Sequence, residues 1–194
     1  DLKEMQNDKN EVFFRNFFEQ CSTLMQSIIK LPQPVIAQIH GTAAAAGCQL
    51  VATCDLAIAS TTAKFATPGV NIGLFCSTPM VAVSRKLPRK KMMEMLLMGD
   101  LVDAETALEF GLINRVVAYD QLEETVSNYA NKIREKSPLV LKIGKEAFYN
   151  QIDMPLADAY KYTAEVMTQN MLVQDANEGI NAFIEKRAPT WTGK

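Results

Sequence analysis

The spacing of apolar side chains changes several times along the chain, and each change predicts a different element. Between residues 11 and 31 they recur every three or four positions, as on one face of an amphipathic helix, and two prolines then end it. That face consists of Val12, Phe13, Phe17, Leu24, Met25, Ile28 and Ile29. Short runs rich in β-branched and small apolar residues at 34–40, 55–60 and 64–66 predict three strands.

Helical spacing dominates the second half of the chain. The predicted helices span residues 90–98, 103–110, 121–136, 138–151, 156–172 and 175–186, with one extended piece at 113–118. Gly111 is expected to close the second of these helices as a C-terminal cap. Because the strands stop near residue 118, we predict two parts: an α/β core over residues 1–118 and a helical region over residues 119–194.

The composition narrows the classes of function. Of 194 residues, 48 % are hydrophobic and 22 % are charged, as in one soluble globular domain. A formal net charge of -2 gives no electrostatic basis for binding nucleic acid, and no apolar run reaches the roughly 18 residues of a membrane span. One histidine and four dispersed cysteines make no metal-ligand set. The chain begins at Asp1 without a methionine or a leader, so we expect that an N-terminal segment precedes it.

The segment of greatest chemical interest consists of small residues. Residues 42–48 have the sequence TAAAAGC, and their alanine density predicts a helix. The first N–H groups of a helix have no internal partner and lie at the positive end of its dipole, so a substrate oxygen can approach them there. The same small side chains would equally allow close packing against a sheet. From the residues alone, both interpretations stay open.

Four sequence blocks, in order and at fitting distances, carry a family resemblance. They are HGTAAAAGCQLVATCDLAIA at 40–59, AKFATPGVNIG at 63–73, MGDLVDAETALEFGLINRVV at 98–117 and EGINAFIEKR at 178–187, and DLKEM at 1–5 is similar to the end of a further motif. Together they resemble the crotonase (enoyl-CoA hydratase/isomerase) family, most closely its enoyl-CoA hydratase domain-containing subgroup. The resemblance implies an α/β fold with a crotonase (ClpP-like) spiral core, a C-terminal helical trimerisation region, and N-terminal strands that lie outside this chain.

The resemblance also implies a mechanism. In the crotonase family, two backbone N–H groups hold the thioester carbonyl of acyl-CoA and stabilise an enolate-like intermediate. One of them falls on Ala46, and the other about three residues before Asp1. Hydratases carry two acid–base glutamates where this chain has Gln49 and Gly69, so we expect hydratase chemistry to be weak or altered. Glycine after Pro68 would also suit a positive φ.

Further positions acquire binding roles from the same resemblance. Lys3 and Lys186 match lysines near the CoA phosphates, with a solvated surface lysine as the alternative for each. Cys76 and Ser77 belong to the loop that would face the acyl group. The full substrate-binding set that the family implies is Asp1, Lys3, Ala46, Cys76, Ser77, Phe183 and Lys186. No metal and no separate cofactor is implied, because coenzyme A is part of the substrate.

Two classes of function stay open at this stage. One is an acyl-CoA enzyme of the hydratase/isomerase type, a lyase or isomerase of fatty acid metabolism with weak or altered chemistry. The other is a non-catalytic acyl-CoA-binding or regulatory protein, which the loss of both glutamates favours. The resemblance implies a homotrimer or hexamer, assembled through residues 119–194. We expect a soluble intracellular protein, cytoplasmic if bacterial or alternatively mitochondrial.

Overall fold

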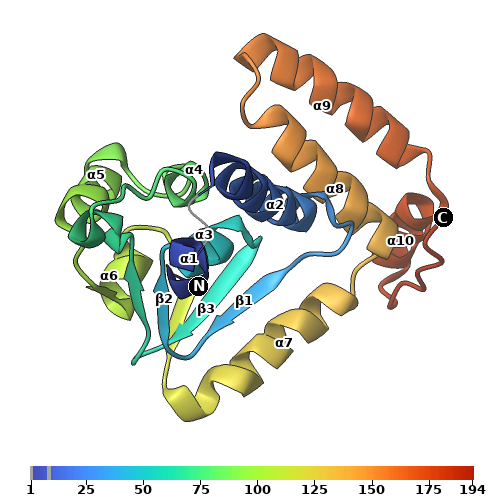
Figure 1. Cartoon of the computed structure of the whole chain (residues 1–194). Helices are drawn as coiled ribbons and strands as arrows, with labels where there is room; N and C mark the ends of the chain where they lie inside the picture. The colour runs from blue at the N-terminus through green and yellow to red at the C-terminus, as the bar shows by residue number, and fades with distance from the viewer. Residues whose placement is uncertain (1, 8–9) are drawn as a thin grey trace. The chain divides into compact units, whose positions relative to one another are not determined.

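The computed structural model describes residues 2–7 and 10–194. Backbone contacts divide the chain into two compact units. The first unit comprises residues up to 29 together with 35–125, and the second comprises residues 30–34 and 126–194. Figure 1 labels helices α1 to α10 and strands β1 to β3. Each candidate functional residue is therefore described within its own unit.

Two small sheets form the centre of the first unit (Figure 1). The strands are β1 (Ile36–Ile39), β2 (Thr42–Ala44), β3 (Leu56–Ser60), β4 (Lys64–Ala66), β5 (Val102–Asp103) and β6 (Arg115–Val117). In one sheet β3 pairs in parallel with both β1 and β6; in the other, β4 pairs in parallel with β2 and antiparallel with β5. From β1 to β4 the chain alternates between the two sheets, so it winds through both as a spiral. The predicted α/β crotonase fold is confirmed.

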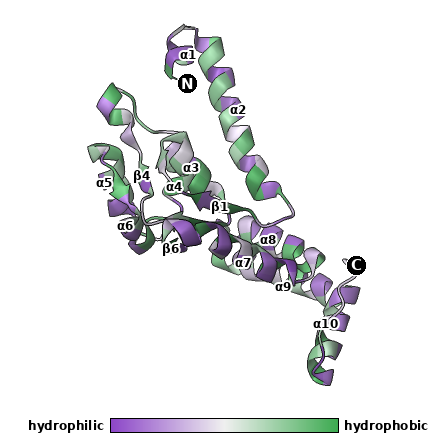
Figure 2. Cartoon of the chain, turned by 90° about the horizontal axis from the view of Figure 1, so that it is seen from below, coloured by the Kyte–Doolittle hydropathy of each residue, from purple (hydrophilic) through white to green (hydrophobic). Residues whose placement is uncertain are grey.

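Helices accompany these sheets in the first unit. They are α1 (Leu2–Asn7), α2 (Glu11–Lys30), α3 (Ala46–Thr53), the 3-10 helix η1 (Pro68–Ile72), α4 (Pro79–Val83), α5 (Arg89–Met98), α6 (Ala104–Glu109) and the 3-10 helix η2 (Tyr119–Gln121). Figure 2 colours α2 in alternating purple and green, as its amphipathic sequence predicts. Met25 is its one buried residue in the described structure, so most of the apolar face of α2 stays accessible in a single chain.

Small and branched side chains build the core of the first unit. Its largest fully buried apolar side chains are Phe65, Ile58 and Val83, and Cys48 of α3 is also fully buried. Helix α3 packs against α4 and against strand β2. Because protein interiors are close-packed, the small residues along α3 allow both neighbours to approach its backbone. The start of α3 is therefore held between a strand and a helix.

The second unit is helical, as predicted. Its helices are α7 (Leu122–Arg134, which begins in the first unit), α8 (Pro138–Gln151), α9 (Leu156–Met171) and α10 (Gln174–Glu185). After α10 the chain forms a strap over residues 188–194. Trp191 of the strap donates from Nε1 to the Glu135 carbonyl at 2.7 Å, and its ring atom lies 3.1 Å from the place of a Cβ on Gly179. The strap is thus fixed to both α7's C-terminal end and α10.

A buried carboxylate, that of Asp175, is the main polar anchor of this strap. Asp175 is only 1 % exposed. It accepts hydrogen bonds from the Ser137 hydroxyl at 2.5 Å, from the Thr192 N–H at 2.7 Å and from the Gly193 N–H at 3.1 Å. These donors satisfy a charge that would be costly to bury alone. Asp175 therefore ties the strap to the start of α8.

One sequence prediction is wrong in an informative way. Residues 42–44, predicted as helix from their alanine density, form strand β2, and α3 begins only at Ala46. Helix propensity is a weak preference that tertiary pairing overrides, and here β2 pairs with β4. Gly111 has a φ of 85°, as its predicted role after α6 requires. The division at residue 118 into a core and an oligomerisation region stays a prediction.

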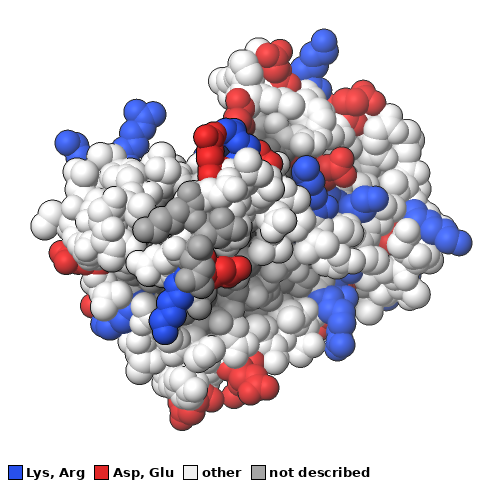
Figure 3. Space-filling view, in the orientation of Figure 1, with Lys and Arg blue, Asp and Glu red and all other residues white. Residues whose placement is uncertain are grey.

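The surface carries charges of both signs. On the face shown in Figure 3, acidic and basic side chains are interspersed and separated by uncharged surface. None of the described helices combines the length and the apolar character that a membrane crossing requires. Among residues 2–7 and 10–194, no three histidine, cysteine or acidic side chains gather as metal ligands would.

The Asp175 carboxylate leads to a pH-dependent prediction. Hydrogen bonds, the strongest from Ser137, lower the pKa of Asp175 from 3.8 to about 2. A carboxyl group whose pKa is lower in the folded state than in the unfolded state stabilises the folded state fully when the pH is above the unfolded-state pKa. This stabilisation is lost as the pH falls from about 4 toward about 2. We expect Asp175→Asn to lower Tm at pH 7. The difference in Tm between this variant and the parent chain should shrink as the pH falls toward 2.

Thermal unfolding followed by circular dichroism at pH 7, 4 and 2.5 measures this gap. The matched control is Asp153→Asn, which changes an exposed aspartate of the same unit and should leave Tm unchanged. A gap between Asp175→Asn and the parent that stays constant with pH would contradict the role given to the carboxylate charge.

Candidate functional site

Strand pairing fixes the turn between β2 and α3. Ala44 lies opposite Ala66 in the parallel β2–β4 pair, and the N–H of Ala45 donates to the Ala66 carbonyl at 3.0 Å. Ala45 has φ 49° and ψ -113°, a conformation that favours glycine. On its other side, the Gln49 N–H donates to the Ala45 carbonyl at 3.0 Å. Hydrogen bonds on both sides therefore hold Ala45 in a strained conformation.

Helix α3 begins at Ala46, directly after this turn. Ala46 is exposed, and its amide is the first of the helix, where an N–H has no partner inside the helix. Among the described residues, no other group accepts a hydrogen bond from this N–H. Only Ala45 and Gly47 flank it, so no bulky side chain blocks an approaching oxygen. The start of α3 can therefore bind a negatively polarised oxygen at the positive end of the helix dipole.

The same small residues also serve packing. Ala43 of β2 is buried, and a Cβ on Gly47 would lie 3.9 Å from the Ala43 Cβ, an ordinary contact distance. Glycine is therefore not required at position 47 by steric crowding. The two interpretations left open by the sequence concern different parts of one segment: Ala43 packs inward, and the Ala46 amide is accessible.

The family resemblance predicts that Gln49 stands at one of the two positions where hydratases carry a glutamate. It lies on α3 and is 5 % exposed, and its carbonyl accepts a hydrogen bond from the Thr53 hydroxyl at 2.7 Å. Within the described chain, no hydrogen bond joins its side-chain amide to another residue. An amide can donate and accept hydrogen bonds, but it neither takes nor gives a proton at neutral pH. Gln49 can orient a bound group but cannot act as its general base.

Gly69, the predicted second glutamate position, has little room for a side chain. A Cβ there would lie 3.1 Å from the Cys76 Sγ, 3.2 Å from the Cys76 nitrogen and 3.1 Å from the Leu74 carbonyl oxygen. The expected positive φ is wrong for Gly69: the described glycines with positive φ are Gly73, Gly99, Gly111 and Gly193. Glycine is needed here because Cys76 and its backbone occupy the space, and the following loop folds back onto η1.

Two buried thiols lie beneath this site. Cys48 of α3 is fully buried and Cys76 is 7 % exposed. Burial, together with a smaller effect of the neighbouring Cys76, raises the pKa of the Cys48 thiol to about 12. Because the thiolate is the nucleophilic form, Cys48 stays an unreactive thiol at neutral pH. Cys48 is therefore not a general base at neutral pH.

A buried hydroxyl without a partner stands beside these groups. Thr67 immediately precedes Pro68, is fully buried, and its Oγ1 forms no hydrogen bond in the described structure. A buried hydroxyl in this state costs stability, on the order of 1–3 kcal/mol. Neither Thr67 nor the strained Ala45 was singled out from the sequence. No local signal identifies them, because alanine is not typical of positive φ and the burial of Thr67 depends on tertiary packing.

The remaining predicted site residues fall in both units. In the first unit, Lys3 is exposed on α1, and Ser77 is exposed in the loop before α4 with its hydroxyl 3.4 Å from the Phe75 carbonyl. In the second unit, Phe183 on α10 is 85 % exposed, and Lys186 ends α10 with a positive φ of 56°. Asp1 lies outside the described residues. Gln49 on α3, Gly69 on η1 and Cys76 after η1 thus all belong to the first unit. Phe183 and Lys186 belong to the second unit.

The strain at Ala45 predicts a stabilising substitution. A non-glycine residue in such a conformation costs on the order of 1–3 kcal/mol, while glycine adds about 0.4–1 kcal/mol of unfolded-state entropy. We expect Ala45→Gly to stabilise the chain by about 1 kcal/mol. The matched control is Ala44→Gly in β2, which should destabilise by about 0.5–1 kcal/mol. Urea unfolding midpoints at constant m-value measure both; a lower midpoint for Ala45→Gly would show that its conformation is not strained.

Comparison with known proteins places this geometry in a family. The family model described as enoyl-CoA hydratase/isomerase matches residues 1–194. The chain is 47 % identical to enoyl-CoA hydratase domain-containing protein 3, mitochondrial, of Xenopus laevis, over 98 % of this chain and 65 % of that protein. The curated relatives of this name are covered over 63–66 % of their length, so the chain spans somewhat less than two thirds of them.

Solved structures agree with this match. The chain superposes on an enoyl-CoA hydratase of Mycobacterium smegmatis with a TM-score of 0.97 at 46 % identity, over 98 % of this chain and 74 % of that one. Human enoyl coenzyme A hydratase domain-containing protein 3 gives a TM-score of 0.96, also at 46 % identity, over 98 % of this chain and 76 % of that one. The chain therefore belongs to the enoyl-CoA hydratase/isomerase, or crotonase, family.

Proposed function

We propose that this protein binds acyl-CoA thioesters at the start of α3 and that its hydratase activity is very low. The observation that carries the proposal is the exposed Ala46 at the start of α3, together with the absence of a carboxylate at Gln49 and Gly69. The thioester carbonyl oxygen accepts a hydrogen bond from the Ala46 N–H, which favours the enolate-like charge that develops there. The second donor that the family resemblance implies falls before Asp1.

Proton transfer is the step that this chain is poorly equipped to perform. Gln49 can hold a water or a substrate oxygen by hydrogen bonds but cannot change its protonation state. At the other position, the Cys76 Sγ occupies the space beside Gly69 in which a carboxylate side chain would begin. General acid–base groups contribute about 10²–10⁴-fold each. Polarisation of the thioester without proton transfer is the chemistry that these residues support.

A non-catalytic acyl-CoA-binding or regulatory protein is the second candidate function. The filled position beside Gly69 favours it, because a thiol and backbone in tight contact leave no room for a second catalytic group there. The two candidates share the binding step and differ only in turnover. The hydration assay described below separates them.

Assembly and location are further parts of the proposal. Leu156, Tyr160 and Met167 of α9 are 75 %, 69 % and 57 % exposed, which supports burial of α9 against other copies in a homotrimer or hexamer. The names of the curated relatives place those proteins in mitochondria, which supports the mitochondrial alternative over the cytoplasmic one.

Binding is tested by titration calorimetry of the protein at its natural length with butyryl-CoA. We expect Ala46→Leu to weaken binding about tenfold or more, because the larger side chain crowds the carbonyl beside the amide. Ala46→Gly is the matched control: it keeps the N–H and removes only the Cβ, so affinity should be retained. The absence of heat at millimolar butyryl-CoA would rule out the binding proposal.

Hydration is tested with crotonyl-CoA. We expect almost no hydration by the parent chain and none by Gln49→Glu, which supplies one carboxylate without a partner. Gly69→Glu alone should lower Tm because its Cβ meets Cys76. Adding Cys76→Gly to Gln49→Glu/Gly69→Glu removes the contact with Sγ, although the backbone contacts of Leu74 and Cys76 remain, and should yield measurable hydration, on the order of 10²-fold above the parent.

The Tm of each variant shows whether a loss of activity reflects unfolding. A parent rate close to that of ordinary hydratases would show that other residues, with Ser77 and Asn71 the next to test, supply the acid and base.

A further inference from the structure

The loop between η1 and α4 folds back and places a thiol beside Gly69. The Leu74 N–H donates to the Gly69 carbonyl at 2.9 Å, and the Met80 N–H at the start of α4 donates to the Cys76 carbonyl at 2.9 Å. Between these two hydrogen bonds, the Cys76 Sγ lies 3.1 Å from the place of a Cβ on Gly69. A side chain at position 69 would press on this sulfur, so glycine leaves it uncovered on that side.

The Cys76 thiol lies close to the first turn of α3. Cys48, two residues after the exposed Ala46, is near enough to Cys76 for that thiol to affect its pKa. Helix α3 also packs against α4, which begins three residues after Cys76. The two thiols differ in access, because Cys48 is fully buried whereas Cys76 keeps 7 % of its surface exposed. Of this pair, Cys76 is therefore the thiol that a bound molecule can reach.

An unpaired amide side chain is directed to the same place. Gln49 is 5 % exposed, and its amide forms no hydrogen bond within the described chain. Its amide still touches solvent: among the described residues that are not exposed, only Thr67 has a side-chain oxygen or nitrogen both shut off and unpaired. Gln49 follows Ala46 by one helical turn, and helical side chains lean toward the N-terminal end. A polar group of a ligand at the start of α3 would satisfy this amide.

The loop that carries Cys76 also presents an apolar surface. Ile72, Leu74 and Phe75 are 57 %, 52 % and 43 % exposed. Exposed side chains of this size within one short segment indicate contact with an apolar group. An acyl thioester combines what this place fits: a carbonyl oxygen for the Ala46 amide and an apolar chain for the loop.

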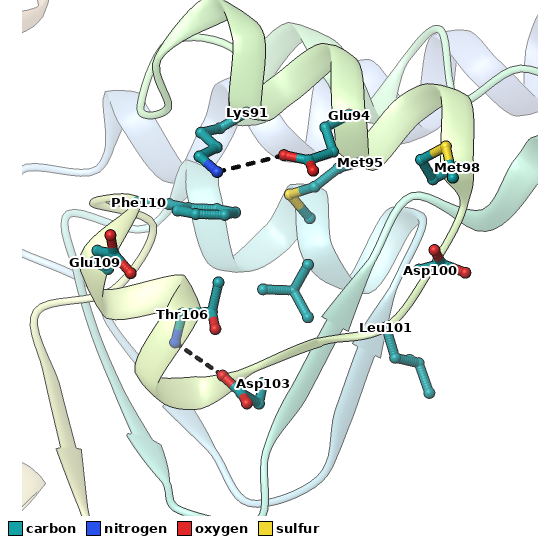
Figure 4. Close-up of a pocket in the computed structure, with 11 residues that line it drawn as sticks. Lys91, Glu94, Met95, Met98, Asp100, Leu101, Asp103, Thr106, Glu109 and Phe110 are labelled. Atoms are coloured by element: carbon teal, nitrogen blue, oxygen red, sulfur yellow. Dashed lines mark hydrogen bonds and ion pairs between the residues drawn. The ribbon is translucent and has the colours of Figure 1, made fainter.

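A hollow between α5 and α6 fits such a ligand less well (Figure 4). It has a volume of about 400 Å³ and is bordered by the carboxylates of Glu94, Asp100, Asp103 and Glu109. Lys91, the cation among its lining residues, lies 3.4 Å from a Glu94 oxygen, as the dashed line in Figure 4 shows. Four carboxylates and one engaged lysine repel the phosphates of coenzyme A. Acyl-CoA is therefore favoured beside α3 over this hollow.

We propose that Cys76 accepts the acyl group of the bound acyl-CoA by thioester exchange, an inference that rests on the binding proposed above. The Cys76 thiol gives its proton to water, and the sulfur attacks the carbonyl carbon. The carbonyl electron pair moves to the oxygen, where the Ala46 N–H stabilises the charge, and returns as the bond to the CoA sulfur breaks. The CoA thiolate then takes a proton from water. One thioester replaces another, so the step needs no oxidant, reductant or carboxylate.

The lack of carboxylates preserves the product of this exchange. Hydrolysis of the acyl group on Cys76 requires an activated water, and a general base activates water by taking its proton. Gln49 cannot take that proton, and Gly69 has no side chain. The same two positions that make hydration poor therefore leave the acyl group attached to the protein.

Mass spectrometry of the intact protein, at its natural length and incubated with butyryl-CoA, tests the transfer. We expect one added butyryl group, which hydroxylamine at neutral pH releases because it cleaves thioesters and not amides. Peptide mapping should place the group on Cys76. Cys76→Ala should abolish the adduct. Ala46→Leu should slow its formation about tenfold or more, because the larger side chain keeps the carbonyl away from the amide.

Cys21 is the matched control thiol. It lies within α2 and is half-buried, so it is more exposed than Cys76. Acylation that depended on access alone would modify Cys21 first. Cys21→Ala makes the same change as Cys76→Ala outside the loop and should leave the adduct unchanged. The Tm of each variant shows whether it is folded, and the mapping on the parent chain decides the site if Cys76→Ala is not.

Three results would overturn the inference. The first is the absence of an adduct although calorimetry shows that butyryl-CoA binds the parent chain; this result leaves the binding proposal intact. The second is an adduct on Cys21 or on a lysine. The third is an adduct that forms as fast in Ala46→Leu as in the parent. The absence of both heat and adduct overturns the binding proposal as well.

Discussion

The parallel pairing of β2 with β4 is the interaction on which the candidate site depends. It places Ala45 where its N–H reaches the Ala66 carbonyl, and the chain must then turn through a conformation that an alanine seldom adopts. That abrupt turn lets α3 begin one residue later with an accessible amide. If the strand continued or the helix started earlier, the first N–H groups would be used internally or buried. The position of the Ala46 amide is therefore a property of the sheet, transmitted through one strained residue.

The two predicted acid–base positions, Gln49 and Gly69, differ from glutamate in two different ways. Gln49 keeps the size and hydrogen-bonding shape of a glutamate and loses only its ability to carry charge. Gly69 loses the side chain altogether, and Cys76 from the next loop occupies the space. The result is a region of buried, neutral groups: an amide, two thiols and the unpaired Thr67 hydroxyl. None of these groups is a carboxylate.

Much of the fold follows from the spacing of apolar residues, and much of the site does not. The long helices were predicted to within two residues because periodicity over ten or more positions is a strong signal. The alanine-rich segment at 42–48 was misassigned in part because alanine fits either element and only β4 decides between them. The reason for glycine at position 69 was also missed. It lies in a contact with Cys76, seven residues away, that no local rule encodes.

The strap that carries Trp191 has a spectroscopic consequence. This is the only tryptophan of the chain, and it lies entirely within the second unit, between the end of α7 and α10. Its emission therefore reports the packing of that unit, whereas far-ultraviolet dichroism reports the helices of both. Denaturation curves from the two signals would coincide only if the units unfold together. A single native fluorophore thus reads out whether the α/β unit and the helical unit form one cooperative system.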